Sequence, residues 1–319
     1  MKNEISQILK YTSIAPSSHN TQPWQVAVKG DTILLYADFS RSLHHSDPDN
    51  RELYVSLGAA LQNTLHAIDG LGYNYNLEYF PESNNELIAK ISVKFDGRGN
   101  QNNEILEAMK RRHSNRNKYE DKDIPENITN SWKELAKDLG VELCVVRNKK
   151  DRSKIGDLVA AGTIDAMKNK AFKKELSKWV RHNLTKASDG MPGYGFNMPT
   201  VVSFFSPLAI KYLNIASSQA KLEKTLIDSS PVVCVICGKN NTLSWVKAGR
   251  VYERIVVDAE KKNIKSATMT AAVEIGEYHK ELMRILGSRE RPLVMFRLGY
   301  YNKIPKPTPK RSVNEILRD

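Results

Sequence analysis

Hydrophobic and polar positions repeat along the chain with two different periods, and together they predict a mixture of helices and strands. From Arg51 to Gly70 the apolar residues recur every three or four positions, which is typical of an amphipathic helix. Residues 74–80 and 89–95 alternate with a period of two, which is typical of strands. The pattern also predicts a hairpin over 25–38 that turns at Gly30-Asp31. Further helices are expected over 3–13, 127–139, 151–187, 214–227, 245–262 and 277–286, and one more helix is expected to end near Arg112. Further strands are expected over 141–146, 231–238 and 291–300.

The order of these elements predicts an α+β or α/β chain with one or two sheets. Residues 58–74 and 249–265 resemble each other, because each begins with a glycine, continues as an apolar-striped helix and ends in a turn. This loose repeat indicates two related halves. The polar stretch around Gln101–Glu104 is the expected seam between them.

Charge indicates the kind of ligand. The 319 residues carry a formal net charge of +12, which favours anionic partners. The lysines are scattered and no nucleic-acid-binding motif accompanies them, so a phosphate-bearing small ligand is favoured over nucleic acid. We expect no nucleic-acid partner.

Residues 190–210 contain no charged side chain, which raises the question of a membrane span. Three prolines and three glycines within the stretch argue against a lipid-embedded helix, so we predict a mobile, partly apolar loop. The N-terminus has no apolar signal region. A cytoplasmic location and no membrane partner are therefore expected.

The cysteines and histidines predict neither a redox pair nor a metal site. Cys234 and Cys237 lie in an apolar strand, where residues three apart point to opposite faces. We therefore interpret them as small buried hydrophobic residues. The seven histidines show no metal-ligand spacing, and we expect no metal.

Three polar clusters are candidates for chemistry. The first is APSSHNTQPW (15–24), the second KRRHSNRNKYE (110–120) and the third PKPTPKRSVNEIL (305–317). Arginine forks beside a hydroxyl, as in the second cluster, suit a phosphate or a polarised carbonyl. Each cluster also has a plainer interpretation: a hydrogen-bonded turn, a solvated basic helix end, and a flexible basic tail.

Taken together, the three clusters resemble motifs of the nitroreductase superfamily of FMN-dependent flavoproteins. The motifs appear as Ala15 to Trp24, as Arg112-His113-Ser114-Asn115-Arg116, and as Gly299-Tyr300 followed by Lys310-Arg311. In the family the arginine-serine motif comes before the Pro-Ser-Ser motif, whereas here it follows. The chain therefore resembles in particular the Acg-like branch, in which two nitroreductase-like halves are fused. The resemblance implies halves at 1–103 and 104–319.

The resemblance also implies a fold and a function. It implies an α+β nitroreductase-like pseudo-dimer, with central antiparallel or mixed sheets flanked by helices and one complete FMN site per chain. The implied FMN contacts are Ser17, Ser18, Asn20, Arg112, Ser114, Arg116, Thr270, Lys310 and Arg311. No catalytic side chain is implied, because the flavin would carry the hydride chemistry.

The function implied is an oxidoreductase that passes hydride from NADPH or NADH to a nitroaromatic, a quinone or a similar planar acceptor. A monomer would be sufficient, with a homodimer left open. The alternative is a flavin-storage protein with 190–210 as a lid.

Overall fold

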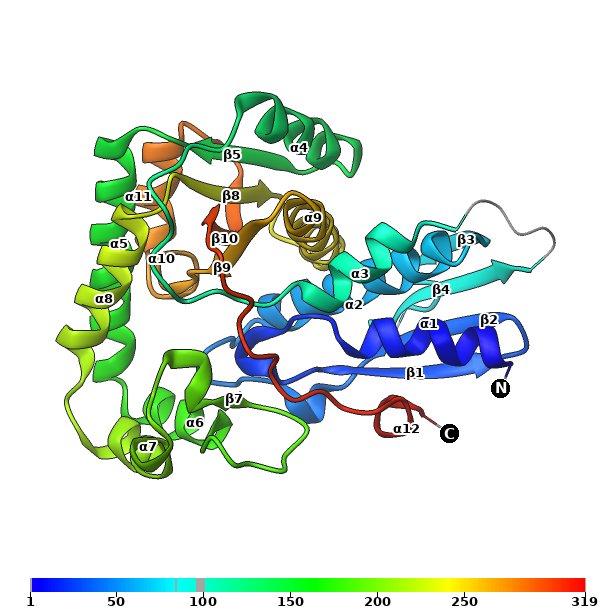
Figure 1. The fold of residues 1–319 in the computed structure, drawn as a ribbon, viewed down its shortest axis with the longest axis horizontal. Helices are drawn as coiled ribbons and strands as arrows, with labels where there is room; N and C mark the ends of the chain where they lie inside the picture. Colours follow the sequence, from blue (N-terminus) through cyan, green and yellow to red (C-terminus); the bar gives the residue numbers. More distant parts are fainter. Residues whose placement is uncertain (1, 84, 96–100, 319) are drawn as a thin grey trace.

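Two four-stranded antiparallel sheets form the frame of the protein (Figure 1). The structure is a computed structural model that describes residues 2–83, 85–95 and 101–318. The first sheet has the order β1 (Trp24–Lys29), β2 (Thr32–Ala37), β4 (Leu87–Lys94), β3 (Asn74–Tyr79). The second has the order β5 (Glu142–Val146), β8 (Val232–Gly238), β10 (Arg291–Tyr300), β9 (Ile264–Thr268). The predicted α+β class is confirmed.

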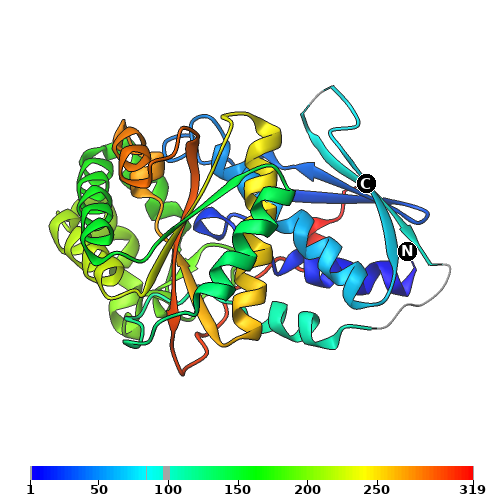
Figure 2. The same ribbon diagram turned by 90° about the horizontal axis from the view of Figure 1, so that it is seen from above.

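Two long helices, α2 (Arg51–Gly70) and α9 (Thr242–Lys261), pack against each other between the sheets (Figure 2). Glycine allows their backbones to touch, because a Cβ at Gly58 would collide with the Val246 carbonyl oxygen. The reciprocal contact also exists, since a Cβ at Gly249 would collide with the Val55 carbonyl oxygen. Within α2, Gly58 follows Val55 by three residues, and within α9, Gly249 follows Val246 by three residues. An approximate two-fold relation between the repeats beginning at Gly58 and Gly249 would produce this symmetry.

Further helices pack around this frame. Helices α1 (Asn3–Ser13) and α3 (Asn103–Arg111) pack beside α2, and α4 (Glu126–Asp138) packs on β5 and α9. Helices α5 (Lys149–Lys168), α8 (Ala216–Asp228), α10 (Ala271–Glu274) and α11 (Tyr278–Leu286) gather on the other side of the second sheet (Figure 2). Strand β8 is therefore buried on both faces. Cys234 faces the inner core and Cys237 the outer one, so the prediction that they point apart is confirmed.

The chain crosses between the two sheets twice. After α3, Ser114 forms a bridge with Ser266 at the edge of β9. At the C-terminus α12 (Val313–Ile316) packs on α1 and β1, and Leu317 forms a bridge with Val26 (Figure 1). The last residues of the chain therefore lie on the first sheet. Residues 96–100, part of the predicted seam region, fall outside the described residues.

The expectation of a loop throughout 190–210 is wrong. The 3-10 turn Gly193–Phe196 is followed by α7 (Thr200–Tyr212), which contains Pro207. Proline leaves the carbonyl four residues before it without its helical partner, and here the Ser206 hydroxyl donates to that carbonyl, on Ser203, at 2.7 Å. Among the described helices, none combines the length and apolarity that crossing a bilayer requires.

The predicted basic helical region 151–187 is in fact two helices that stop early. Asn169 ends α5, and its side chain caps α6 (Lys170–Trp179) by accepting the N–H groups of Ala171 and Phe172. Beyond α6, β6 (Val180–Arg181) pairs with β7 (Met191–Pro192). We call residues 180–215, which include α7, the lid.

Candidate functional site

The three polar clusters meet at one cavity beneath the lid. Eight of the predicted site residues line it: Ser17, Ser18, Asn20, Arg112, Ser114, Arg116, Thr270 and Lys310. They come from the loop before β1, the segment after α3, the N-terminus of α10 and the C-terminal segment. The cavity is thus assembled from segments far apart in the sequence, and the lid adds Met191, Tyr194, Gly195 and Asn197.

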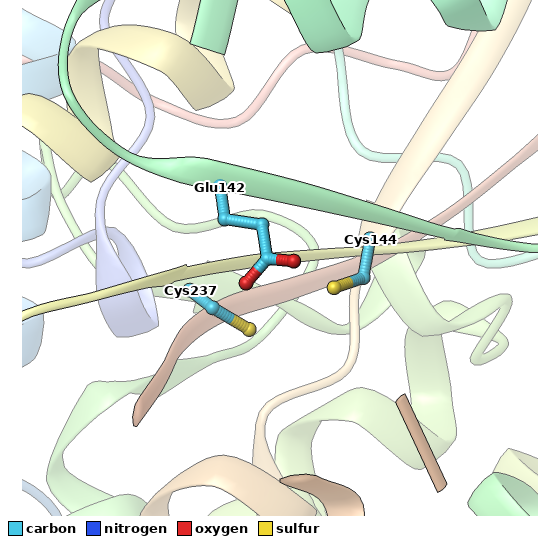
Figure 3. A group of neighbouring side chains, drawn as sticks. All are labelled: Glu142, Cys144 and Cys237. Carbon is cyan, nitrogen blue, oxygen red and sulfur yellow. The ribbon is translucent and has the colours of Figure 1, made fainter. Parts of the chain in front are cut away.

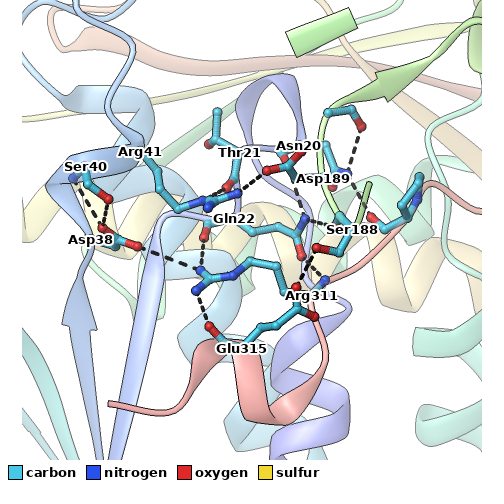
Figure 4. A network of polar contacts seen from close by, with 12 residues as sticks. Asn20, Thr21, Gln22, Asp38, Ser40, Arg41, Ser188, Asp189, Arg311 and Glu315 are labelled. Carbon is cyan, nitrogen blue, oxygen red and sulfur yellow. Dashed lines mark hydrogen bonds and ion pairs between the residues drawn. The ribbon is translucent and has the colours of Figure 1, made fainter. Parts of the chain in front are cut away.

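Arg311 is the ninth predicted residue, and the structure does not bring it to the described lining of the cavity. Its guanidinium donates to the Gln22 carbonyl at 3.0 Å, and its backbone N–H donates to Gln22 Oε1 at 2.8 Å (Figure 4). The guanidinium also donates to the Trp24 carbonyl at 3.0 Å. Gln22 Nε2 in turn donates to the Ser188 carbonyl at 2.8 Å. Arg311 therefore fixes the loop that carries the predicted flavin contacts.

Asn20 ties three segments together. Its Nδ2 donates to the Gly190 and Pro309 carbonyls, both at 2.9 Å, and its Oδ1 accepts from Lys310 Nζ at 3.0 Å. The φ of Asn20 is +56°, a left-handed conformation that asparagine tolerates better than most residues. The polar composition of 15–24 thus serves first to join the loop to the lid and the C-terminal segment.

Cationic groups form one wall of the cavity. Arg112 is buried, with its Nε 3.3 Å from Glu253 Oε1. The Arg116 guanidinium lies over the Phe196 ring, 4.5 Å from the centroid. Lys310 Nζ donates to the Ala15 carbonyl at 2.5 Å in addition to Asn20. Of these three cations, Arg112 is the one with a carboxylate beside it.

The pKa values of Lys310 and of the neighbouring His113 are lowered in this wall. Burial, and then the neighbouring Arg112 charge, lower the pKa of Lys310 to about 7, against an influence of Glu253 that raises it. Burial, followed by Arg112, Lys310 and Lys265, lowers the pKa of His113 to about 4. His113 is therefore neutral at pH 7, and Lys310 is poised to gain a proton when an anion arrives.

Burial raises the pKa of acidic side chains near the cavity. Glu52 lines the cavity, and burial together with Glu274 raises its pKa to about 8. Burial likewise raises the pKa of Glu274 and of Asp47 to about 7 each. Asp47 also accepts the backbone N–H groups of Glu52 and Leu53, at 3.0 and 2.9 Å. Glu52 is the one acid in the described cavity lining, and in protonated form it adds no negative charge to that lining.

A second, mainly apolar cavity adjoins the first. The two cavities share His19, Arg116, Met191, Thr268 and Thr270. The apolar lining comes from α5, α6, α10 and the lid and includes Met167, Phe172, Leu176, Phe196, Met198, Ile210 and Ile275. The lid thus contributes to both cavities, one cationic and one apolar.

The chain is similar to curated proteins along almost its whole length. "Putative NAD(P)H nitroreductase Rv3131" of Mycobacterium tuberculosis (strain H37Rv) is 24% identical over 98% of this chain and 90% of that protein. "Putative NAD(P)H nitroreductase acg" of the same strain is 21% identical over 98% of this chain and 95% of that protein. The chain is thus similar, over almost its whole length, to proteins that are named as putative NAD(P)H nitroreductases. No family model matches the sequence.

Solved structures of nitroreductases match about two thirds of the chain. FMN- and NADPH-dependent nitroreductase NfnB from Sphigopyxis sp. strain HMH covers 67% of the chain and 97% of its own, with 14% identity and a TM-score of 0.45. FMN-dependent NfnB from Mycobacterium smegmatis, in complex with NADPH, covers 64% and 94%, with 16% identity and a TM-score of 0.41.

Sequence reasoning missed several residues of the site. Glu52 and Ser56 line the cavity from α2, where the Ser56 hydroxyl accepts the Ser18 N–H at 3.3 Å. Tyr252 reaches the cavity from α9. All three lie close to Gly58 or Gly249 in the repeated helices. The apolar stripe of these helices was recognised, whereas the polar positions beside it carried no motif.

A cluster on the outer face of the second sheet lies apart from both cavities (Figure 3). Cys237 faces Cys144 of the neighbouring strand β5, and with Glu142 their ligand atoms lie within 4.8 Å of one another. A hydrogen bond with Cys144, and then burial, raise the pKa of Cys237. The Glu142 carboxylate accepts the Ser288 hydroxyl at 2.6 Å. This Cys237 thiol is therefore protonated and unreactive at neutral pH.

Proposed function

We propose that the chain is an FMN-binding oxidoreductase of nitroreductase type, which takes hydride from NADPH or NADH and passes it to a planar acceptor such as a nitroaromatic or a quinone. The observation that carries the proposal is the shared cavity, where seven residues of the three distant motifs come together with Thr270. The names of the relatives Rv3131 and acg support the same type of reaction.

The cationic wall fits the phosphate of FMN. Arg112, Arg116 and Lys310 supply charge-assisted donors, and Ser114 adds a hydroxyl. Their positive charge exceeds the negative charge of the described lining, because Glu52 is protonated at neutral pH. A dianionic phosphate would compensate this excess and raise the pKa of Lys310 from about 7.

The opposite end of the cavity suits a flat polar ring. Ser17 and Ser18 would hydrogen-bond the ring edge, and Asn20 would hold their loop in place. Thr270 would lie beside the reacting part of the ring. Bound FMN would supply hydride transfer between NAD(P)H and the acceptor.

The adjoining cavity is suited to the acceptor, because its lining is mostly apolar and it shares Arg116 and Thr270 with the first. Glu52 and Glu274 lie one in each lining, with pKa values raised by burial to about 8 and about 7, so Glu52 is mostly protonated and Glu274 partly protonated at neutral pH. These carboxyl groups would keep protons near an acceptor as it is reduced.

We further propose that the site is composite, with halves at 1–103 and 104–319. The loop 17–20 belongs to the first half, whereas Arg112, Arg116, Thr270 and Lys310 belong to the second. Each half would supply what the other lacks, so one chain would hold one complete FMN site. A monomer would then be sufficient for activity.

Mixing the FMN-loaded protein with NADPH without oxygen separates an enzyme from a storage protein. We expect the flavin absorbance to bleach and to return when a quinone or a nitroaromatic is added. A control with FMN and NADPH but no protein corrects for free reaction. Bound flavin that stays oxidised with both NADPH and NADH would contradict the oxidoreductase and support storage.

A further inference from the structure

Helix α7 of the lid presents a continuous apolar surface to the outside. Val201, Phe204, Phe205, Leu208 and Tyr212 are all exposed, with Val201 at 74% and Phe205 at 63% of full exposure. Their spacing of three or four residues places them on one side of the helix. Val202 and Leu213 extend the same exposed surface. We call these seven residues the α7 stripe.

The α7 stripe lies on the side of the helix that does not pack against the rest of the protein. The opposite side of α7 carries Ser203, Ser206 and Ile210, which are buried, and Ile210 lines the apolar cavity. Seven of the thirteen exposed large hydrophobic side chains of the described chain belong to the stripe. Monomeric water-soluble proteins rarely gather apolar side chains in this way unless the surface binds something.

The exposed charges in the sequence around the stripe are mostly positive. Within residues 166–222 the exposed charged side chains are lysines: Lys168, Lys170, Lys174, Lys178, Lys186, Lys211 and Lys221. The exposed Asp165, one position before this range, pairs with Lys168 at 2.8 Å. The two acids of this range are engaged, because buried Glu175 accepts from Ser46 and Asp189 pairs with Arg41 and Arg181. Apart from Asp165, the exposed charges in this part of the described chain are therefore cations.

We propose that the α7 stripe and its surrounding lysines bind the surface of an anionic lipid bilayer. An amphipathic helix with aromatic residues on one side and lysines around it is suited to lie in the bilayer interface. The lysines would approach the lipid phosphates while the side chains of the stripe enter the acyl boundary. Tyr212, beside Lys211, would lie at the headgroup level.

A second copy of the chain fits this surface less well. Two copies joined through α7 by a two-fold axis would bring the same lysines face to face. Like charges placed opposite each other oppose association. An anionic bilayer would cover the apolar stripe and also balance the charge of the lysines. A symmetric dimer would cover the stripe but would leave that charge unbalanced.

This mode of binding requires no membrane-spanning segment. Helix α7 has 13 residues, about 20 Å in length, and would lie parallel to the bilayer plane. The expectation of no membrane partner rested on the proline and glycine content of 190–210, which argues against a span and does not address a helix lying on the surface.

Sedimentation with lipid vesicles tests the proposal without any need for flavin. We expect the full chain to co-sediment with vesicles of equal parts phosphatidylglycerol and phosphatidylcholine, and much less with pure phosphatidylcholine. High salt should weaken the binding because it screens the lysines. The double variant V201S/F205S should bind at least about tenfold more weakly, since it removes two exposed apolar anchors.

Control variants outside the α7 stripe test whether vesicle binding depends on this surface or on any exposed apolar or charged side chain. Ile304 is 60% exposed outside the lid, so I304S should bind vesicles like the parent chain. K174Q/K211Q should weaken binding, whereas K29Q/K94Q, at the far end of the first sheet, should not (Figure 1). Circular dichroism checks that each variant is folded.

Several results would overturn the proposal. These are no sedimentation with anionic vesicles, equal binding to neutral vesicles, or unchanged binding by V201S/F205S. Concentration-dependent self-association that V201S/F205S abolishes, without vesicle binding, would instead assign the stripe to a second copy.

Discussion

Replacing Gly58 with alanine is expected to lower the free energy of unfolding by about 3 kcal/mol or more. The added methyl would collide with the Val246 carbonyl oxygen of α9, which is backbone and cannot rotate away. Gly249→Ala should cost a similar amount, because its methyl would collide with the Val55 carbonyl oxygen of α2. Urea denaturation followed by circular dichroism measures both effects.

Gly156→Ala is the matched control, since Gly156 also lies in a helix interior. Its added methyl would meet the Lys224 side chain at 3.2 Å, and that flexible chain can shift. Alanine favours a helix over glycine by up to about 1 kcal/mol, so this variant should be neutral or slightly stabilised. The double variant G58A/G249A should cost less than the sum of the single variants, because both changes separate the same two helices. Equal stabilities for G58A and G156A would contradict the close helix contact.

Replacing Lys310 with methionine is expected to weaken FMN binding by about 100-fold, the upper range for loss of one charge-assisted hydrogen bond. Lys310 Nζ lies in the cationic wall and also holds Asn20 Oδ1 at 3.0 Å and the Ala15 carbonyl at 2.5 Å. The variant would thus lose a phosphate contact and an anchor of the loop. Quenching of FMN fluorescence on titration with protein measures the affinity.

The pH dependence of FMN binding identifies the charge on Lys310. The pKa of Lys310 is about 7 without ligand, below its ordinary value of 10.5, and a bound phosphate would raise it. Binding therefore takes up a proton, and the affinity should fall as the pH rises from 7 to 9, by at most about tenfold per unit. K310R should keep a flatter profile, because arginine stays charged.

Lys306 provides the control for both measurements. It lines the same cavity but is exposed, with its ammonium 4.4 Å from the centroid of the Tyr194 ring. Lys306→Met should therefore change the FMN affinity only slightly. A loss as large as that of K310M would show that the general charge of the rim, rather than the position of Lys310, determines binding.

Much of the fold follows from local periodicity. Helix α2 was predicted with its observed bounds, Arg51–Gly70, because a long apolar stripe leaves little ambiguity. The hairpin at Gly30-Asp31 was found because its turn residues and alternating strands agree, and Gly30 has the positive φ such turns require. Strand β9 was missed, since five residues entering the sheet from a helix end carry too little pattern.

The features that the sequence did not predict depend on contacts that form only in the folded chain. Helix α7 was not predicted, because Pro207 and the neighbouring glycines favour a loop. In the structure the Ser206 hydroxyl donates to the Ser203 carbonyl, which would otherwise lack a hydrogen-bond partner at Pro207. Seven of the eight candidates in the motifs line the cavity, as does Thr270, but the direction of Arg311 depends on how the C-terminal segment lies on β1. The protonated state of Glu52 follows from its burial beside Glu274, a residue more than two hundred positions away.

The amount of FMN retained by the protein tests the central claim, that residues of both halves form one composite flavin site. The purified chain is incubated with FMN and desalted, and the flavin absorbance is compared with the protein concentration. The account predicts a yellow protein with one FMN per chain. A colourless protein, or two FMN per chain, would contradict it.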